Sequence, residues 1–175
     1  MSFGFRAAST RDRDEGPELV RLTDLYLLHA FRQAAVLTGH LLAADLAILQ
    51  ALSGTTVTRG IDAVRRGWDG RSTPAMGKAA MVDCGLDLPG APSLADACEQ
   101  AHITTSACGQ STQTQERVAA QAVQRALTIG LVCARHLGRY TWEQAVDVNE
   151  IMAATAWDCF APRASTPTGG DHGAA

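Results

Sequence analysis

The sequence predicts an all-α fold, a helical bundle of three long helices with two or three short helices packed across one side. Apolar residues recur every three to four positions over long stretches, as they do on one face of a helix. Residues typical of helix ends stand at the limits of these stretches. No stretch shows the alternation of β-branched and polar residues that a half-buried strand requires. The predicted long helices span about 17–52, 115–139 and 141–160.

Length and composition fit a single folded domain. The chain has 175 residues, of which 46% are hydrophobic and 19% are charged, and this is enough to bury a hydrophobic core. We expect a flexible charged arm over residues 1–16, a single helical domain over 17–161 and a disordered tail over 162–175.

Cysteine usage and the N-terminal residues bear on the cellular compartment. The five cysteines are odd in number and widely spaced, with no CxxC pair, so a disulfide framework is not expected. Residues 1–16 lack the apolar run of a secretory signal. We therefore expect an intracellular, cytoplasmic and non-secreted protein.

The first long helix is expected to begin at Pro17 and to end before Gly54, because proline suits the first helical turn and glycine commonly follows the last one. Gly39 interrupts the pattern, so we allow a kink or a split into two helices there. Residues 34–52 are apolar enough to suggest a membrane span, but Asp45 lies among them, and a charge inside a bilayer is costly. A buried helix of a globular fold is the preferred interpretation.

Shorter helices are predicted between the long ones, over about 57–68, 73–84 and 93–102. The first carries apolar residues at helical spacing. The second begins with a Thr-Pro pair, and the third begins with a Ser-Leu-Ala-Asp segment that resembles a capping box. Both segments are typical of helix N-termini.

The two closing helices have the strongest local signals. The helix over 115–139 carries a narrow seam of mostly small residues, which lets a neighbouring helix approach closely. The seam consists of Ala119, Val123, Ala126, Gly130, Cys133 and Leu137. The helix over 141–160 is preceded by a Thr-Trp-Glu-Gln segment that resembles a capping box, and Pro162 ends it.

Two polar residues are expected inside apolar helix faces. Asp45 falls in the centre of the apolar stripe of the first long helix, and Asn149 falls within that of the last one. A buried carboxylate is costly without a partner. The two side chains are therefore candidates for a hydrogen bond that fixes the register of the helices, or for a ligand site.

Other interpretations of Asp45 remain open. A kink at Gly39 could turn its carboxylate into solvent, or an arginine from a short helix could pair with it. It could also lie in the interface of an oligomer.

Two cysteine–histidine combinations could carry chemistry. Cys108 and His102 flank the start of a polar loop, where an imidazole could deprotonate a thiol, and the alternative is an idle thiol. Cys133 and His136 stand three residues apart in a helix and could offer two ligands to a metal. No second spaced pair completes such a site, so an ordinary buried cysteine is the alternative. We expect no cofactor, and no metal is favoured.

Charge and surface patterning bear on partners. The net charge is −3, and the arginines around Trp68 are diluted by Asp62 and Asp69, so a nucleic-acid partner is not favoured. No membrane span is expected. The first long helix is apolar around most of its circumference, and a surplus of this kind is usually buried against another chain.

These observations favour a non-enzymatic helical-bundle module that acts through protein–protein association as a scaffold, adaptor or regulator. We expect it to form a homo-oligomer or to bind a protein partner. The alternative hypothesis is a small-molecule-binding bundle or a small enzyme, with a pocket near Asp45 and Asn149.

Overall fold

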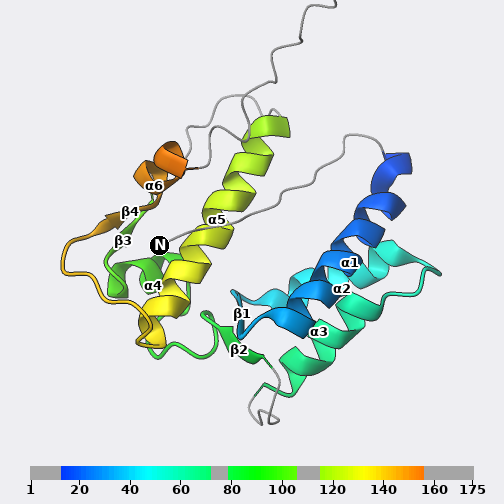
Figure 1. Ribbon diagram of the computed structural model, residues 1–175, viewed down its shortest axis with the longest axis horizontal. Helices are drawn as coiled ribbons and strands as arrows, with labels where there is room; N and C mark the ends of the chain where they lie inside the picture. The colour runs from blue at the N-terminus through cyan, green and yellow to red at the C-terminus, as the bar shows by residue number, and fades with distance from the viewer. Residues whose placement is uncertain (1–12, 72–78, 106–114, 156–175) are drawn as a thin grey trace, which may run out of the picture.

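The computed structural model describes residues 13–71, 79–105 and 115–155, and this part of the chain is mostly helical (Figure 1). The expectation of a helical protein is confirmed, but the predicted bundle of three long helices is not. Two short pairs of parallel strands are also present among the described residues. After a 3-10 turn at Arg13–Glu15, the elements are α1 (Gly16–Gln33), β1 (Val36–Gly39), α2 (Leu42–Ser53), α3 (Arg59–Asp69), β2 (Ala80–Asp83), α4 (Leu94–Gln100), β3 (Ile103–Thr104), α5 (Gln115–His136), β4 (Val146–Asp147) and α6 (Val148–Thr155).

The helices form two groups on either side of the β1–β2 pair. Figure 1 shows α1, α2 and α3 on one side and α4, α5 and α6 on the other. Each group has its own hydrophobic cluster. The smaller cluster is centred on Val20, Leu46, Ile61 and Val64. The larger cluster draws buried residues from β2, α4, α5 and α6, and it includes Cys84, Cys98 and Cys133, which are the cysteines of the described residues and are all buried.

The first predicted helix is split at the position where a split was allowed. α1 ends at Gln33, the chain runs extended through β1, and α2 begins at Leu42. A side chain at Gly39 would place its Cβ only 2.9 Å from the indole of Trp68, so glycine permits this close crossing. Leu41 then takes a left-handed conformation with φ of 55°, which a continuous helix cannot include.

β1 and β2 pair in parallel, with Val36 opposite Ala80 and Gly39 opposite Asp83. The predicted helix over 73–84 is therefore wrong for residues 80–83, and residues 72–78 lie outside the described part. β2 forms a strand because its last residues are buried, and they pair with β1 on one edge. A short apolar run before a glycine has no periodicity that separates strand from helix.

The predicted helix over 141–160 is also wrong in its first turns. Residues 146–147 form β4 and pair in parallel with β3, and α6 begins only at Val148. The indole of Trp142 donates a hydrogen bond of 2.8 Å to the carbonyl oxygen of Ala101, which holds this segment against the end of α4. The carboxylate of Asp147, rather than the side chain of Thr141, caps α6. It accepts hydrogen bonds from the backbone N–H groups of Asn149 and Glu150.

Other predicted elements are confirmed. Ile61, Val64 and Trp68 form the buried face of α3, although Val57 precedes that helix and is exposed. Ser93 and Asp96 form the capping box that opens α4. The predicted helix over 115–139 corresponds to α5, and Gly138 follows its end with a positive φ. None of the described helices has the length and the apolar character needed to cross a bilayer.

α1 and α3 pack at unusually close range. The carboxylate of Asp24 in α1 accepts hydrogen bonds from the backbone N–H groups of Gly60 and Ile61, at 2.8 and 2.9 Å. It therefore caps the N-terminus of α3 from another helix. A Cβ at Gly60 would lie 1.9 Å from the backbone oxygen of Asp24. Only glycine allows this contact.

A pair of glycine substitutions tests this contact. Gly60→Ala should lower the free energy of unfolding by about 3 kcal/mol, because the clash is with backbone atoms that cannot rotate away. Gly130→Ala is the matched control, since a Cβ there meets nothing within 4 Å. In the middle of α5 it should be neutral or stabilise by up to about 1 kcal/mol. Urea unfolding measures both, and equal stability of the two variants would contradict the described contact.

Candidate functional site

Polar groups gather where β1 and β2 end. Because the two strands are parallel, their carboxyl ends meet at one edge, a common position for sites in parallel sheets. His40 and Leu41 follow β1, and Cys84 and Gly85 follow Asp83, the last residue of β2. The backbone N–H of Cys84 donates a hydrogen bond of 2.8 Å to the carbonyl oxygen of Gly39. This bond extends the pairing into the corner, which we call the strand-end corner (residues 40–41 and 83–85).

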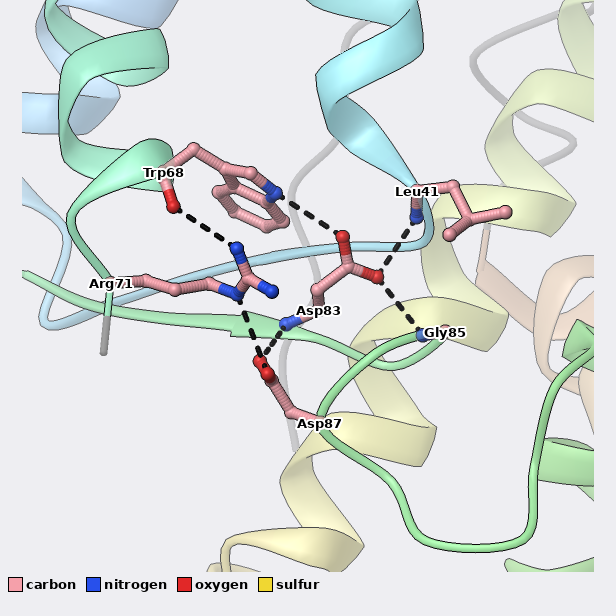
Figure 2. Close-up of polar contacts among 6 residues, drawn as sticks. All are labelled: Leu41, Trp68, Arg71, Asp83, Gly85 and Asp87. Atoms are coloured by element: carbon pink, nitrogen blue, oxygen red, sulfur yellow. Dashed lines mark hydrogen bonds and ion pairs between the residues drawn. The ribbon is translucent and has the colours of Figure 1, made fainter.

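A buried carboxylate organises the strand-end corner. The side chain of Asp83 is inaccessible to solvent, and Figure 2 shows it pointing toward three donors. One oxygen accepts from the backbone N–H groups of Leu41 and Gly85, at 2.9 and 3.0 Å. The other accepts from the indole N–H of Trp68 in α3, at 3.2 Å. A buried charge needs hydrogen-bond partners, and these three bonds supply them.

A second carboxylate supports the first one from outside. Asp87 accepts a hydrogen bond of 2.7 Å from the backbone N–H of Asp83. It also forms an ion pair with Arg71, at 3.4 Å, and Arg71 donates to the backbone oxygen of Trp68 (Figure 2). The ion pair is partly exposed, so its own contribution to stability is modest. Its effect is to hold the loop after β2 against the end of α3.

A thiol and an imidazole meet in the same corner. The sulfur of Cys84 lies 3.4 Å from Nδ1 of His40. Cys84 is fully buried, and His40 nearly so. Cys133 of α5 is also fully buried, and both cysteines belong to the larger hydrophobic cluster. The arrangement therefore combines two thiols of the larger hydrophobic cluster with an imidazole that contacts one of them.

The two thiols differ in acidity. The hydrogen bond from Cys133 and the nearby His40 lower the pKa of Cys84 to about 6, although burial and Asp83 act in the opposite direction. The same hydrogen bond, burial and the charge on Cys84 raise the pKa of Cys133. The pair therefore loses one proton easily and holds the second one. Cys84 is the thiol that ionises, and Cys133 stabilises the resulting thiolate as a donor.

The chemistry open to these groups is limited by their burial. A thiolate beside an imidazole is a nucleophile in general, but Cys84 exposes no surface to a bulky substrate. Among the described residues, no group of three or more histidine, cysteine, aspartate or glutamate side chains is arranged to hold a metal ion. Because Cys84 is fully buried, any thiol chemistry there is limited to small reactants.

The structure does not bring Asp45 and Asn149 together. Asp45 lies on α2 and is exposed, so the prediction that it is buried is wrong. The split at Gly39 resets the helical phase, and Leu46 faces the core in its place. Of the interpretations left open, a carboxylate turned into solvent is the one observed.

Asn149 has a different partner from the one expected. It lies on α6, on the opposite side of the molecule from α2 (Figure 1), and its side-chain oxygen accepts a hydrogen bond of 2.6 Å from Gln124 of α5. A hollow of about 280 Å³ lined by residues of α4 and α5 includes Gln124 and Arg125. Neither Asp45 nor Asn149 lines it. The two predicted residues therefore do not share this hollow.

The predicted pair of Cys133 and His136 does not face one common site. Cys133 is buried beside Cys84, whereas His136 is exposed at the end of α5. His102 is exposed, with a φ of 53°, in the turn before β3. Cys108 lies outside the described residues, so its relation to His102 is not observed.

Sequence reasoning missed His40, Asp83 and Cys84. A signal for them exists in the segments AVLTGH and AMVDCG, each a short apolar run followed within two residues by glycine and a polar side chain. Such runs also fit the last residues of a buried parallel strand. Two of them with polar ends indicate a site where the strands terminate.

A second feature begins at the same corner and covers the exposed side of α2. At 100° per residue, the inward residues of α2 are Leu42, Leu46, Leu49 and Ser53, all buried or half-buried. The outward residues are Ala44, Ile48, Ala51 and Leu52, preceded by Leu41, and all are exposed. We call these five residues the outer face of α2. Asp45 lies at its edge and is the only charged residue of the helix.

Replacing Asp83 tests the buried carboxylate. Asp83→Ala removes the acceptor for three buried donors and should lower the free energy of unfolding by about 3 kcal/mol or more. Asp83→Asn keeps one oxygen but turns an amide N–H₂ toward a donor, and its cost should be intermediate. Asp69→Asn, at an exposed position, should change stability by less than about 0.5 kcal/mol. Denaturant unfolding in which Asp83→Ala matches this control would refute the network.

The ionisation of Cys84 can be followed by the ultraviolet absorbance of its thiolate. The titration of the native protein should contain one thiolate that forms near the pKa of about 6. It should be lost in Cys84→Ser and kept in Cys98→Ser. Since an unfolded thiol ionises near roughly 8.5, Cys84 should add stability as pH rises from about 6, and this gain should disappear as pH falls through that value. Above a pH of roughly 8.5, Cys133 lowers the stability instead. Its pKa is raised in the folded state, so only the unfolded state then ionises that thiol. A titration unchanged in Cys84→Ser would contradict the assignment.

Known proteins provide no template for the strand-end corner or for the outer face of α2. No protein-family model matches the chain, and neither a curated protein nor a solved structure matches it. What these features can do follows from their own contacts, exposure and charge.

Proposed function

We propose that the protein is a non-enzymatic association module, a scaffold, adaptor or regulator, and that it binds a second copy of itself through the outer face of α2. The observation that carries this proposal is the exposure of Ile48 and Leu52, at 58% and 63%, on one face of a helix with a single charged residue. Single exposed apolar side chains are ordinary on protein surfaces. A continuous apolar helix face is not, and it favours a contact with another chain.

The shape of the outer face of α2 supports a second copy as the partner. Ile48 and Leu52 are its large side chains, and Ala44 and Ala51 are its small ones. When two such faces meet about a two-fold axis, the large side chains of one copy can pack against the small ones of the other. A face of one short helix is small for a stable dimer, so the expected association is weak and depends on concentration.

The strand-end corner favours this role because it fixes the start of the helix. The backbone N–H of Leu41, the residue before α2, is held by buried Asp83. Leu41 is also 44% exposed and extends the outer face of α2 toward that corner. A face that is rigid before binding loses less conformational freedom on binding.

Asp45 gives the proposal an internal test. Its carboxylate lies at the edge of the outer face of α2 and forms no hydrogen bond or ion pair with any of the described residues. A second copy would remove part of its hydration without supplying a cation from α2. Asp45 should therefore oppose association and keep it reversible, as edge charges commonly do on exposed apolar surfaces.

Sedimentation equilibrium of the full chain over a range of concentrations tests the proposal. The wild type should show a reversible monomer–dimer equilibrium. Ile48→Asp should weaken the association by at least about tenfold, because it places a charge at the centre of the buried face. Leu86→Asp is the matched control, since Leu86 is 57% exposed but lies outside α2, and it should leave the equilibrium unchanged.

Asp45→Asn should change the strength of association in the opposite direction from Ile48→Asp. It should strengthen the association several-fold, because the neutral side chain is less costly to bury. A wild type that stays monomeric at every concentration would overturn the proposal. So would an equilibrium that Ile48→Asp and Leu86→Asp weaken equally.

A further inference from the structure

A thiol and an imidazole of the strand-end corner, together with the buried thiol of Cys133, remain unused by the association role. Cys84 follows β2 and Cys133 lies on α5, so the two sulfurs come from opposite sides of the packing between the strand pair and that helix. Both side chains are fully buried in the same hydrophobic cluster. His40 reaches Cys84 from the end of β1, with 3.4 Å between Nδ1 and the sulfur.

We propose that Cys84 and Cys133 form a redox-active dithiol that a small hydroperoxide converts to an intramolecular disulfide. Cys84 is the attacking sulfur, Cys133 is the resolving thiol and His40 is a positioning residue that accepts the proton of Cys84. The assignment is independent of the outer face of α2.

The reaction takes two balanced steps. In the first, the sulfur of Cys84 attacks the outer oxygen of the hydroperoxide, the O–O bond breaks, and Cys84 becomes a sulfenic acid. The proton that His40 took from Cys84 passes to the departing alkoxide, which leaves as an alcohol, or as water from hydrogen peroxide. In the second, the sulfur of Cys133 attacks that of Cys84, and its proton leaves with the hydroxyl group as water. Two thiols and one hydroperoxide thus give one disulfide, one alcohol and one water, and a dithiol reductant reverses the change.

The surroundings of Cys84 decide which cysteine reacts first. His40 and Cys133 favour its thiolate, whereas Asp83 opposes it. The charges of Asp83 and Asp87 both raise the pKa of Cys133. Cys98 of α4 belongs to the same cluster, but burial and the nearby charge of Cys84 raise its pKa. Cys98 is therefore a matched control thiol, buried in the same core without an activating imidazole.

Burial also sets the class of oxidant. Neither sulfur is accessible to solvent, so the reactant has to be close to the size of water and has to enter by a local opening. Hydrogen peroxide meets this requirement. A bulky disulfide reagent does not, and it should modify Cys84 only at the rate of unfolding.

The test uses the native full-length chain and hydrogen peroxide at equimolar amounts. After free thiols are blocked with N-ethylmaleimide, non-reducing digestion and mass spectrometry should show a peptide pair linked through Cys84 and Cys133. The link should disappear after dithiothreitol. Cys98→Ser should form it with the same yield. Cys133→Ser should instead accumulate a sulfenic acid on Cys84, which dimedone traps once the oxidised protein is unfolded in its presence.

Further variants separate a chemical role from a structural one. Cys84→Ser should form no link, and Cys133 should then oxidise at least about tenfold more slowly than in the wild type. His40→Asn should slow the formation of the link by about tenfold without preventing it. The proposal is overturned if the folded wild type forms no Cys84–Cys133 link, or if Cys98 is linked with equal yield. The wild-type result decides this even where a variant fails to fold.

Discussion

The structure depends on one buried carboxylate that has no cation among its donors. Asp83 is bound by two backbone N–H groups and one indole N–H, all of them neutral. Its charge is balanced by oriented dipoles, which lose little freedom on folding because they already belong to fixed backbone or to a buried ring. The donors come from the end of β1, the end of β2 and the end of α3. One side chain therefore joins three segments that are far apart in the sequence.

The orientation of α2 follows from this carboxylate. Leu41, whose N–H is held by Asp83, takes a left-handed conformation, and this conformation separates β1 from the first residue of α2. The helical phase that results turns Leu46 inward and Ile48 outward. The apolar face that we assign to association is thus a consequence of a polar interaction in the core. The same corner places His40 beside Cys84, so both proposed roles rest on the geometry of Asp83.

The sequence allowed prediction of elements whose signals are local. α3, the capping box of α4 and the length of α5 depend on periodicity and on end residues that lie within one segment. β1 and β2 could not be predicted in this way, because each has only four residues and pairs with a segment over forty positions away. The phase of Asp45 failed for a related reason. A stripe calculated across Gly39 assumes one continuous helix, and the left-handed turn at Leu41 removes that continuity. The start of the helix predicted over 141–160 failed for a similar reason. The hydrogen bond from Trp142 to Ala101 is a tertiary contact that overrides the local helix signal.

The acidity of Cys84 illustrates why the candidate site depends on neighbours and not on burial alone. Burial acts on all three buried cysteines in the same direction and raises the pKa of each thiol. Only Cys84 also has an imidazole and a donating thiol in contact, and these outweigh both burial and the adjacent carboxylate of Asp83. The carboxylate that fixes the corner therefore works against the ionisation of the thiol beside it. This opposition is expected where one segment serves both stability and chemistry, because the residue that holds Leu41 and Gly85 in place cannot be removed to favour the thiolate without releasing His40 as well.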